Sequence, residues 1–93
     1  MLARNWRVRE GELDVVARSD TTIVFCEVKT RRSDAFGLPA EAVTPAKQAR
    51  IRRLAVQWLA EHARRANVLR FDVASVTLEG RGRWIVDVLE AAF

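Results

Sequence analysis

The 93-residue chain lacks the features that staple or anchor many small proteins. Its single cysteine, Cys26, excludes an internal disulfide. No apolar run approaches the roughly 20 residues that a membrane-spanning helix needs. The start, MLARNWRVRE, contains no hydrophobic signal-peptide core. There is also no repeat, no low-complexity stretch and no interdomain linker, so we expect one cytoplasmic domain over residues 1–93.

The charge of the chain is unevenly distributed. The net charge is +4, with 16 Lys and Arg residues against 12 Asp and Glu residues. The segment 29–65 contains nine basic residues and three acidic ones, and therefore holds the whole positive excess. A surface that faces phosphates has this property, and so does a solvated, arginine-rich helix face. Charge alone leaves both interpretations open.

Hydrophobic periodicity predicts five strands and one helix. Thr44 and Pro45 form a helix start, and the helix is expected to run to about Arg65 with an apolar stripe at Ile51, Leu54, Ala55, Trp58 and Leu59. The strands are expected over residues 2–8, 12–18, 22–30, 68–78 and 84–89, with a loop over 31–43. The order β-β-β-α-β-β predicts a mixed α/β domain. Its three tryptophans are expected in or beside the core, at Trp6, Trp58 and Trp84.

Charged residues interrupt two of the predicted strands. Strand alternation places Glu12 and Asp14 on one face of the second strand, and Glu27 and Lys29 on one face of the third. A two-residue loop at Ser19-Asp20 puts Glu12 opposite Glu27, whereas a four-residue loop from Ser19 to Thr22 puts Asp14 there. Both even-length loops gather the four charges on one face. An odd-length loop would turn the apolar residues of the second strand towards the acids, so hydrophobic patterning favours the gathered arrangement.

Carboxylates on neighbouring strands repel each other unless another group balances them. A divalent cation does so, because Mg²⁺ prefers one or two carboxylates with waters and a substrate phosphate completing its shell. Lys29, two residues after Glu27, would lie on the same face and could orient or deprotonate a water that attacks a phosphodiester. The alternative is a ladder of surface salt bridges, which predicts more polar neighbours than this face has.

The residues around this cluster are similar to a known family. Asp14 followed by Glu27-Val28-Lys29 resembles the PD-(D/E)xK motif of the restriction-endonuclease-like superfamily. The stretches ARNWRVREGELDVVAR, VFCEVKTRRSDAFG, EAVTPAKQARIRRLAVQWL and RFDVASV resemble, more closely, the YraN-like family over nearly the whole chain. The resemblance implies a restriction-endonuclease-like core similar to archaeal Holliday-junction resolvases. It also implies a nuclease that depends on Mg²⁺ or Mn²⁺.

The same resemblance implies roles for individual residues. Asp14 and Glu27 would be the metal ligands, Lys29 the catalytic lysine and Glu12 an auxiliary acid in the same pocket. The residues that would bind nucleic acid are Arg31, Arg32, Lys47, Gln48 and Arg50.

One departure from the family pattern concerns the first residues. Family members usually begin with a helix that bears a glutamate and packs on the sheet, whereas this sequence begins directly at the first strand. We therefore expect an apolar sheet face without a cover, and either a homodimer or a truncated product. Two functions are left open. One is an Mg²⁺- or Mn²⁺-dependent endodeoxyribonuclease acting on branched or single-stranded DNA, and the other is a non-catalytic nucleic-acid-binding module.

Overall fold

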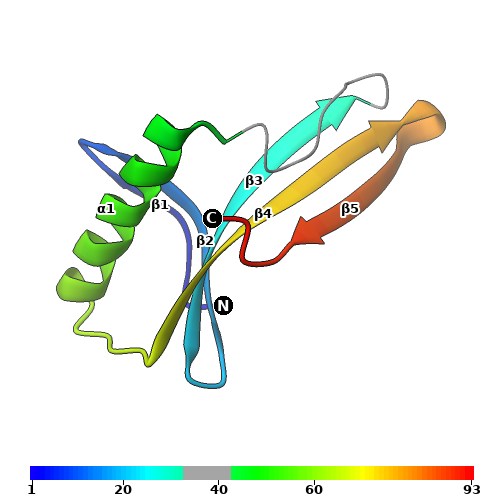
Figure 1. Ribbon diagram of the computed structural model, residues 1–93. Helices are drawn as coiled ribbons and strands as arrows, with labels where there is room; N and C mark the ends of the chain where they lie inside the picture. The colour runs from blue at the N-terminus through cyan, green and yellow to red at the C-terminus, as the bar shows by residue number, and fades with distance from the viewer. Residues whose placement is uncertain (33–42) are drawn as a thin grey trace.

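The computed structural model describes residues 1–32 and 43–93, which form one five-stranded sheet and one helix (Figure 1). The strands follow each other in the sheet in sequence order, from β1 to β5. Their bounds are β1 Ala3–Val8, β2 Gly11–Ser19, β3 Thr22–Arg32, β4 Val68–Glu79 and β5 Arg83–Leu89, and the helix is α1 Pro45–Glu61. The predicted β-β-β-α-β-β order and mixed α/β class are confirmed.

Strand β3 joins the antiparallel part of the sheet to its parallel part. It pairs antiparallel with β2 and parallel with β4, because α1 lies between β3 and β4 in the chain and returns it to the same end of the sheet. The parallel ladder runs from Thr22–Val68 to Arg32–Leu78. Strand β3 is therefore longer than predicted and extends into the expected loop, of which residues 33–42 lie outside the described part of the chain.

The β2–β3 hairpin has one of the two predicted even registers. Ser19 pairs with Thr22 across a two-residue turn, in which Asp20 has φ 57°. Asp is one of the few residues that adopt such a conformation readily. The last pair of this ladder is Val15–Cys26. One step further along the same register Asp14 faces Glu27, as predicted for the four-residue loop, and the additional Ser19–Thr22 pair shortens the turn itself to Asp20 and Thr21.

Helix α1 begins as the sequence predicts. The Thr44 hydroxyl accepts a hydrogen bond from the Lys47 amide at 3.2 Å, and Pro45 occupies the first helical position. The predicted end at Arg65 is wrong, because the last helical residue is Glu61 and Ala63 has φ 49°. At that left-handed turn the Arg64 amide donates to the Leu59 carbonyl, which closes the helix one turn early.

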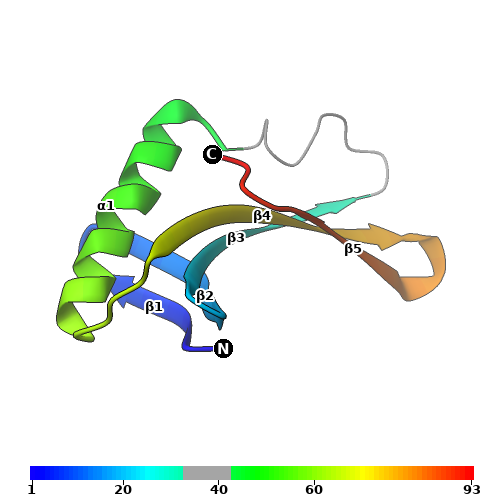
Figure 2. The same ribbon diagram turned by 60° about the horizontal axis from the view of Figure 1, so that its bottom comes forward.

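The hydrophobic core lies between α1 and the sheet (Figure 2). The largest fully buried side chains include Trp58, Phe25 and Val16. Leu13 belongs to the same core as Val16, although strict alternation would put residues three apart on opposite faces. The ladder between β1 and β2 is interrupted at Asp14, opposite Asn5, which has φ 52°. Contrary to the prediction, the side chains of residues 12–18 therefore do not alternate regularly between the two faces of the sheet, because the alternation is broken at Asp14.

The β4–β5 hairpin extends away from α1 (Figures 1 and 2). Trp84 at its far end is 57% exposed, so the prediction that it packs in or beside the core is wrong. Trp58 is in the core and Trp6 packs against it, as expected. In the described ranges, no helix is long and apolar enough to cross a membrane.

Candidate active site

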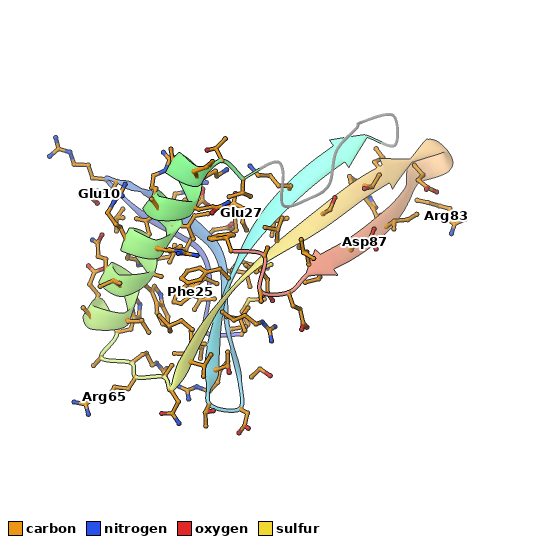
Figure 3. All side chains as sticks on the ribbon, viewed as in Figure 1. Glu10, Phe25, Glu27, Arg65, Arg83 and Asp87 are labelled. Atoms are coloured by element: carbon orange, nitrogen blue, oxygen red, sulfur yellow. The ribbon has the colours of Figure 1, made fainter. Side chains whose placement is uncertain are left out.

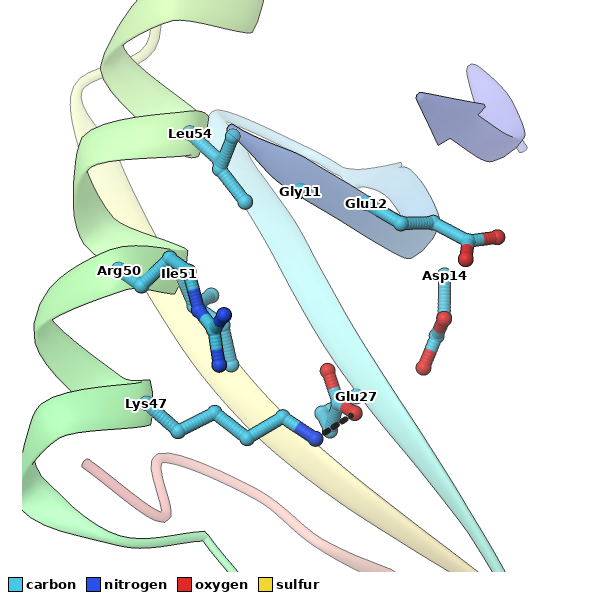
Figure 4. A pocket seen from close by; sticks show the side chains of 8 residues that line it. All are labelled: Gly11, Glu12, Asp14, Glu27, Lys47, Arg50, Ile51 and Leu54. Carbon is cyan, nitrogen blue, oxygen red and sulfur yellow. Dashed lines mark ion pairs between the residues drawn. The ribbon is translucent and has the colours of Figure 1, made fainter. Parts of the chain in front are cut away.

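A pocket of about 220 Å³ lies between the start of β2, the middle of β3 and the first half of α1 (Figure 4). Its lining combines acidic side chains from the strands with basic and apolar side chains from the helix. The lining residues are Gly11, Glu12, Asp14, Glu27, Lys47, Arg50, Ile51 and Leu54. Three of the four charges that the sequence predicts to gather are therefore in one pocket, and the fourth, Lys29, reaches Glu27 from outside the lining.

Asp14 is held in place by the backbone of β3. Its Oδ2 accepts a hydrogen bond from the Val28 amide at 2.8 Å. The regular β2–β3 ladder has just ended at Val15–Cys26, so the carboxylate takes the place of a backbone acceptor. This contact keeps the two strands together and fixes the Asp14 carboxylate beside Glu27.

Glu27 is the most buried charge of the pocket, with only 8% of the residue exposed. Two ammonium groups approach the same carboxylate oxygen, Oε1. Lys47 Nζ lies 3.0 Å away and Lys29 Nζ lies 3.7 Å away. Lys29 comes from the same face of β3 and Lys47 from the first turn of α1, so the helix start supplies a second cation.

The two lysines perturb each other. The pKa of Lys29 is lowered from its ordinary value, first by the neighbouring Lys47 side chain and then by burial. The pKa of Lys47 is raised, first through its contact with Lys29 and further by Glu27, which together outweigh its burial. Because both ammonium groups approach the same Glu27 oxygen, their protonation is coupled.

Glu12 lines the pocket without joining the two inner carboxylates. Its Oε1 lies 3.4 Å from Nε of Arg7, across the β1–β2 hairpin. Figure 4 shows its carboxylate turned away from Glu27. Within residues 1–32 and 43–93, no group of three Asp, Glu, His or Cys side chains is close enough to hold a metal ion. Glu12 is therefore a neighbour of the acidic pair and not a third member of it.

The residues predicted to bind nucleic acid occupy different positions. Arg50 is exposed and lines the pocket, and Lys47 is bound to Glu27. Gln48 donates its side-chain amide to the Val43 carbonyl at 3.0 Å and so holds the chain at the helix start. Arg31 and Arg32 end strand β3, and their side chains lie outside the described part of the structure.

The wall of the pocket depends on a glycine. A Cβ atom at Gly11 would lie 3.1 Å from Cδ1 of Leu54, which is closer than side-chain carbons normally approach. The absence of a side chain at Gly11 therefore lets α1 pack tightly against the start of β2. Gly11 and Leu54 therefore set the spacing of the pocket wall.

A second buried carboxylate, Asp72, was not singled out from the sequence. It is 3% exposed and lies on β4. Its neighbour Val73 belongs to the core under α1, so Asp72 lies on the opposite face of the sheet. Arg70 donates to both of its oxygens at 2.9 Å, and the Ala91 amide donates to Oδ1 at 2.9 Å. The alternating spacing of Arg70 and Asp72 on one strand face was the available signal for this pair.

The donor set of the pocket fits a small, hard divalent cation. Asp14 and Glu27 offer carboxylate oxygens from adjacent strands, and Mg²⁺ is commonly held by only one or two carboxylates together with waters and phosphate oxygens. Mn²⁺ accepts the same ligands. A metal that needs a complete cage of protein ligands does not fit the residues described here.

The fold and the pocket define a small α/β domain that combines two carboxylates with two lysines at one end of α1. The model of the family described as "Uncharacterised protein family UPF0102" matches residues 1–76, and the chain belongs to this family. The predicted family membership is thereby confirmed.

Several UPF0102 proteins are similar to the chain over most of its length. The protein of Parafrankia sp. (strain EAN1pec) is 54% identical over 93 residues, which are all of this chain and 79% of the relative. The protein of Nocardia farcinica is also 54% identical over the whole chain, which covers 73% of that relative. The protein of Acidothermus cellulolyticus is 67% identical over 63 residues, or 68% of this chain and 48% of the relative.

Proposed function

We propose that the protein is an endonuclease that hydrolyses DNA phosphodiesters with the help of Mg²⁺ or Mn²⁺. The observation that carries the proposal is the pocket in which Asp14 and Glu27 lie side by side with Lys29 and Lys47 on the same Glu27 oxygen. Its residue types match those of the PD-(D/E)xK motif. This agreement supports assigning the fold to the restriction-endonuclease-like superfamily.

The charges of the pocket favour a phosphate once a cation is present. The two inner carboxylates are balanced by the two ammonium groups, so the four side chains are together close to neutral. Asp14 and Glu27 would hold the cation. A divalent cation there would activate a water and offset charge on the phosphoryl oxygens. The resulting net positive charge would attract the DNA backbone.

The remaining residues of the site have separate tasks in this proposal. The Lys29 ammonium orients the attacking water and donates to a phosphoryl oxygen, which stabilises charge as the phosphorus–oxygen bond breaks. Lys47, Gln48 and Arg50 lie at the start of α1, where backbone amides and cations both favour phosphate. Arg31 and Arg32 extend this surface from the end of β3. Glu12 is an auxiliary acid at the rim.

A non-catalytic nucleic-acid-binding module is the second candidate. Two observations favour it: only two carboxylates converge within the described residues, and the Lys47 ammonium contacts Glu27 at 3.0 Å. In that case Lys47 would be the permanent partner of Glu27, and Arg50 with the other exposed arginines of α1 would supply the affinity for DNA.

Cleavage assays separate the two candidates. Labelled duplex, single-stranded and four-way-junction DNA are incubated with Mn²⁺ and the wild type, Asp14→Ala or Lys29→Ala. The nuclease proposal predicts cleavage by the wild type alone, with a preference for branched or single-stranded DNA. Equal residual cleavage by all three proteins would indicate a contaminant and refute the enzyme. Salt-dependent DNA binding without cleavage, lost in Lys47→Ala combined with Arg50→Ala, would support the binding module.

Two further proposals concern the setting of this activity. We propose that the protein acts in the cytoplasm, where a DNA substrate is available to it. We also propose that it acts as a homodimer, because large apolar side chains are exposed on β5.

A further inference from the structure

Strand β5 presents a row of apolar side chains to the solvent. Trp84, Val86 and Val88 are 57%, 59% and 54% exposed. They alternate along the strand and therefore share one face of the sheet. Leu78 of β4, which pairs with Trp84, continues the row and is 37% exposed. Single exposed apolar residues are ordinary, but a contiguous row on one strand marks a surface that binds another protein.

This row lies on the face of the sheet that α1 does not cover. Val88 pairs with Ala74, a neighbour of Val73 in the core under α1, and consecutive residues of a strand point to opposite faces. The hairpin also extends beyond the helix in both ribbon views (Figures 1 and 2). No other element of the described ranges packs on the row.

Strand β5 also has an open edge. In the strand order of the described sheet it borders β4 alone, so the backbone groups of its outer side point outwards. Proteins commonly protect such edges with proline, lysine, a bulge or an inward-pointing charge. The seven residues RWIVDVL contain neither proline nor lysine, and Asp87 is the one acidic residue among them.

We propose that the occupant of this edge is β5 of a second copy, paired antiparallel around a two-fold axis at Ile85. This register places Trp84 opposite Val86 of the second copy, on the apolar face. On the other face it places Arg83 opposite Asp87 of the second copy, twice by symmetry. Both side chains lie on β5, away from α1 (Figure 3).

Charge complementarity selects this register over the one with its axis at Val86. An axis at Val86 would place the charged Asp87 opposite the apolar Ile85 and would leave Arg83 opposite Leu89. With the axis at Ile85, the charged residues meet opposite charges and the apolar residues meet apolar ones. The same patch is used by both copies, as a two-fold interface requires. The sheets of the two copies then form one continuous sheet. Because the two-fold axis is perpendicular to this sheet, both copies carry α1 on the same face of it.

The experiment measures molar mass by size-exclusion chromatography with light scattering, on the full chain. The wild type is expected at twice the 10.6 kDa mass of the chain. Asp87→Arg places arginine opposite arginine and is expected at the monomer mass. The double variant Arg83→Asp with Asp87→Arg restores opposite charges across the interface and is expected to return to the dimer mass.

Two controls make the result specific. Glu61→Arg changes the net charge by the same amount at the exposed end of α1 and should leave the dimer intact. Circular dichroism of each variant establishes that the fold is kept.

A monomeric wild type would overturn the proposal and would assign the apolar row to a different partner. A dimer that persists in Asp87→Arg, or a folded double variant that stays monomeric, would overturn the proposed register. The measurement is independent of cleavage, so its failure leaves the nuclease proposal untouched.

Discussion

Two buried carboxylates on neighbouring strands differ in how their charges are satisfied. Asp72 on β4 is 3% exposed and Glu27 on β3 is 8% exposed. Arg70 binds Asp72 through both oxygens, and the Ala91 amide adds a third hydrogen bond. Glu27 has two ammonium groups competing for one oxygen, and it borders an open pocket.

The difference teaches that burial and pairing alone do not identify a site. Asp72 is satisfied by a bidentate partner of matching shape, so nothing is left for a ligand to do. At Glu27, by contrast, cations crowd one carboxylate and a second carboxylate, Asp14, stands beside it. That arrangement suits a group which must exchange partners when a ligand arrives.

The largest expected effect is on stability at Asp72. Asp72→Asn keeps the shape of the side chain but removes the charge that Arg70 and the Ala91 amide require. We expect the free energy of unfolding to fall by about 2 kcal/mol, because one hydrogen bond from Arg70 loses its acceptor at a side chain that is almost fully buried, while Arg70 itself is partly exposed and stays hydrated. Urea denaturation followed by circular dichroism measures it.

Glu27→Gln is the matched variant at the other carboxylate. It is also isosteric, and its side-chain oxygen can still accept from Lys47, whereas the two hydrogen bonds from Arg70 to Asp72 need two acceptor oxygens. We expect its free energy of unfolding to change by no more than about 1 kcal/mol. Equal losses in the two variants would contradict the distinction between a structural and a functional carboxylate.

The next effect concerns the affinity of the pocket for a cation. Lys47 Nζ lies 3.0 Å from Oε1 of Glu27, one of the two carboxylates that would hold the metal, so Lys47→Met removes a competitor. We expect Mn²⁺ to bind roughly fivefold more tightly, which corresponds to about 1 kcal/mol. Lys29→Met, which removes the more distant ammonium at 3.7 Å, should have a smaller effect. Weaker Mn²⁺ binding by Lys47→Met would show that this lysine supports the metal site.

The basic residues of α1 should contribute less to DNA binding the farther they lie from the pocket. Arg50→Ala is expected to weaken binding and to reduce the slope of log K against log salt by about 1, as for one lost phosphate contact. Arg65→Ala is the control, because Arg65 lies beyond the opposite end of α1 (Figure 3). Identical slopes for both variants would contradict a binding track beside the pocket.

The smallest effect is expected at the rim. Arg7 pairs with Glu12 at 3.4 Å, and its side chain is 75% exposed, so water screens the pair. Arg7→Ala should change the free energy of unfolding by less than about 0.5 kcal/mol in urea denaturation. A loss comparable to that of Asp72→Asn would mean that Glu12 belongs to a tightly coupled network.

Most of the fold could be predicted from local patterns. Alternation placed the strands, and Thr44 with Pro45 placed the start of α1 within a residue of its observed position. The end of the helix could not be predicted in this way, because helical spacing of polar residues continues to Arg65. It is set by the left-handed conformation of Ala63, a residue without any local preference for it.

The site was predicted in outline, with two gaps. The register that sets Asp14 beside Glu27 followed from strand period, but the choice between two turns depended on the Ser19–Thr22 pair. The contact of Lys47 with Glu27 joins residues that are distant in sequence and depends on how α1 packs over β3. The spacing of Arg70 and Asp72 was a signal for their pairing, but the third contact of Asp72 comes from the Ala91 backbone amide, which no side-chain pattern reveals.

The most direct test of the central claim is Mn²⁺ binding to the wild type and to Glu27→Gln, measured by isothermal titration calorimetry. We predict that one Mn²⁺ binds to each wild-type chain and that binding is lost in Glu27→Gln, while circular dichroism shows the same fold. Undiminished binding by a folded Glu27→Gln variant would contradict the assignment of this carboxylate as the functional one.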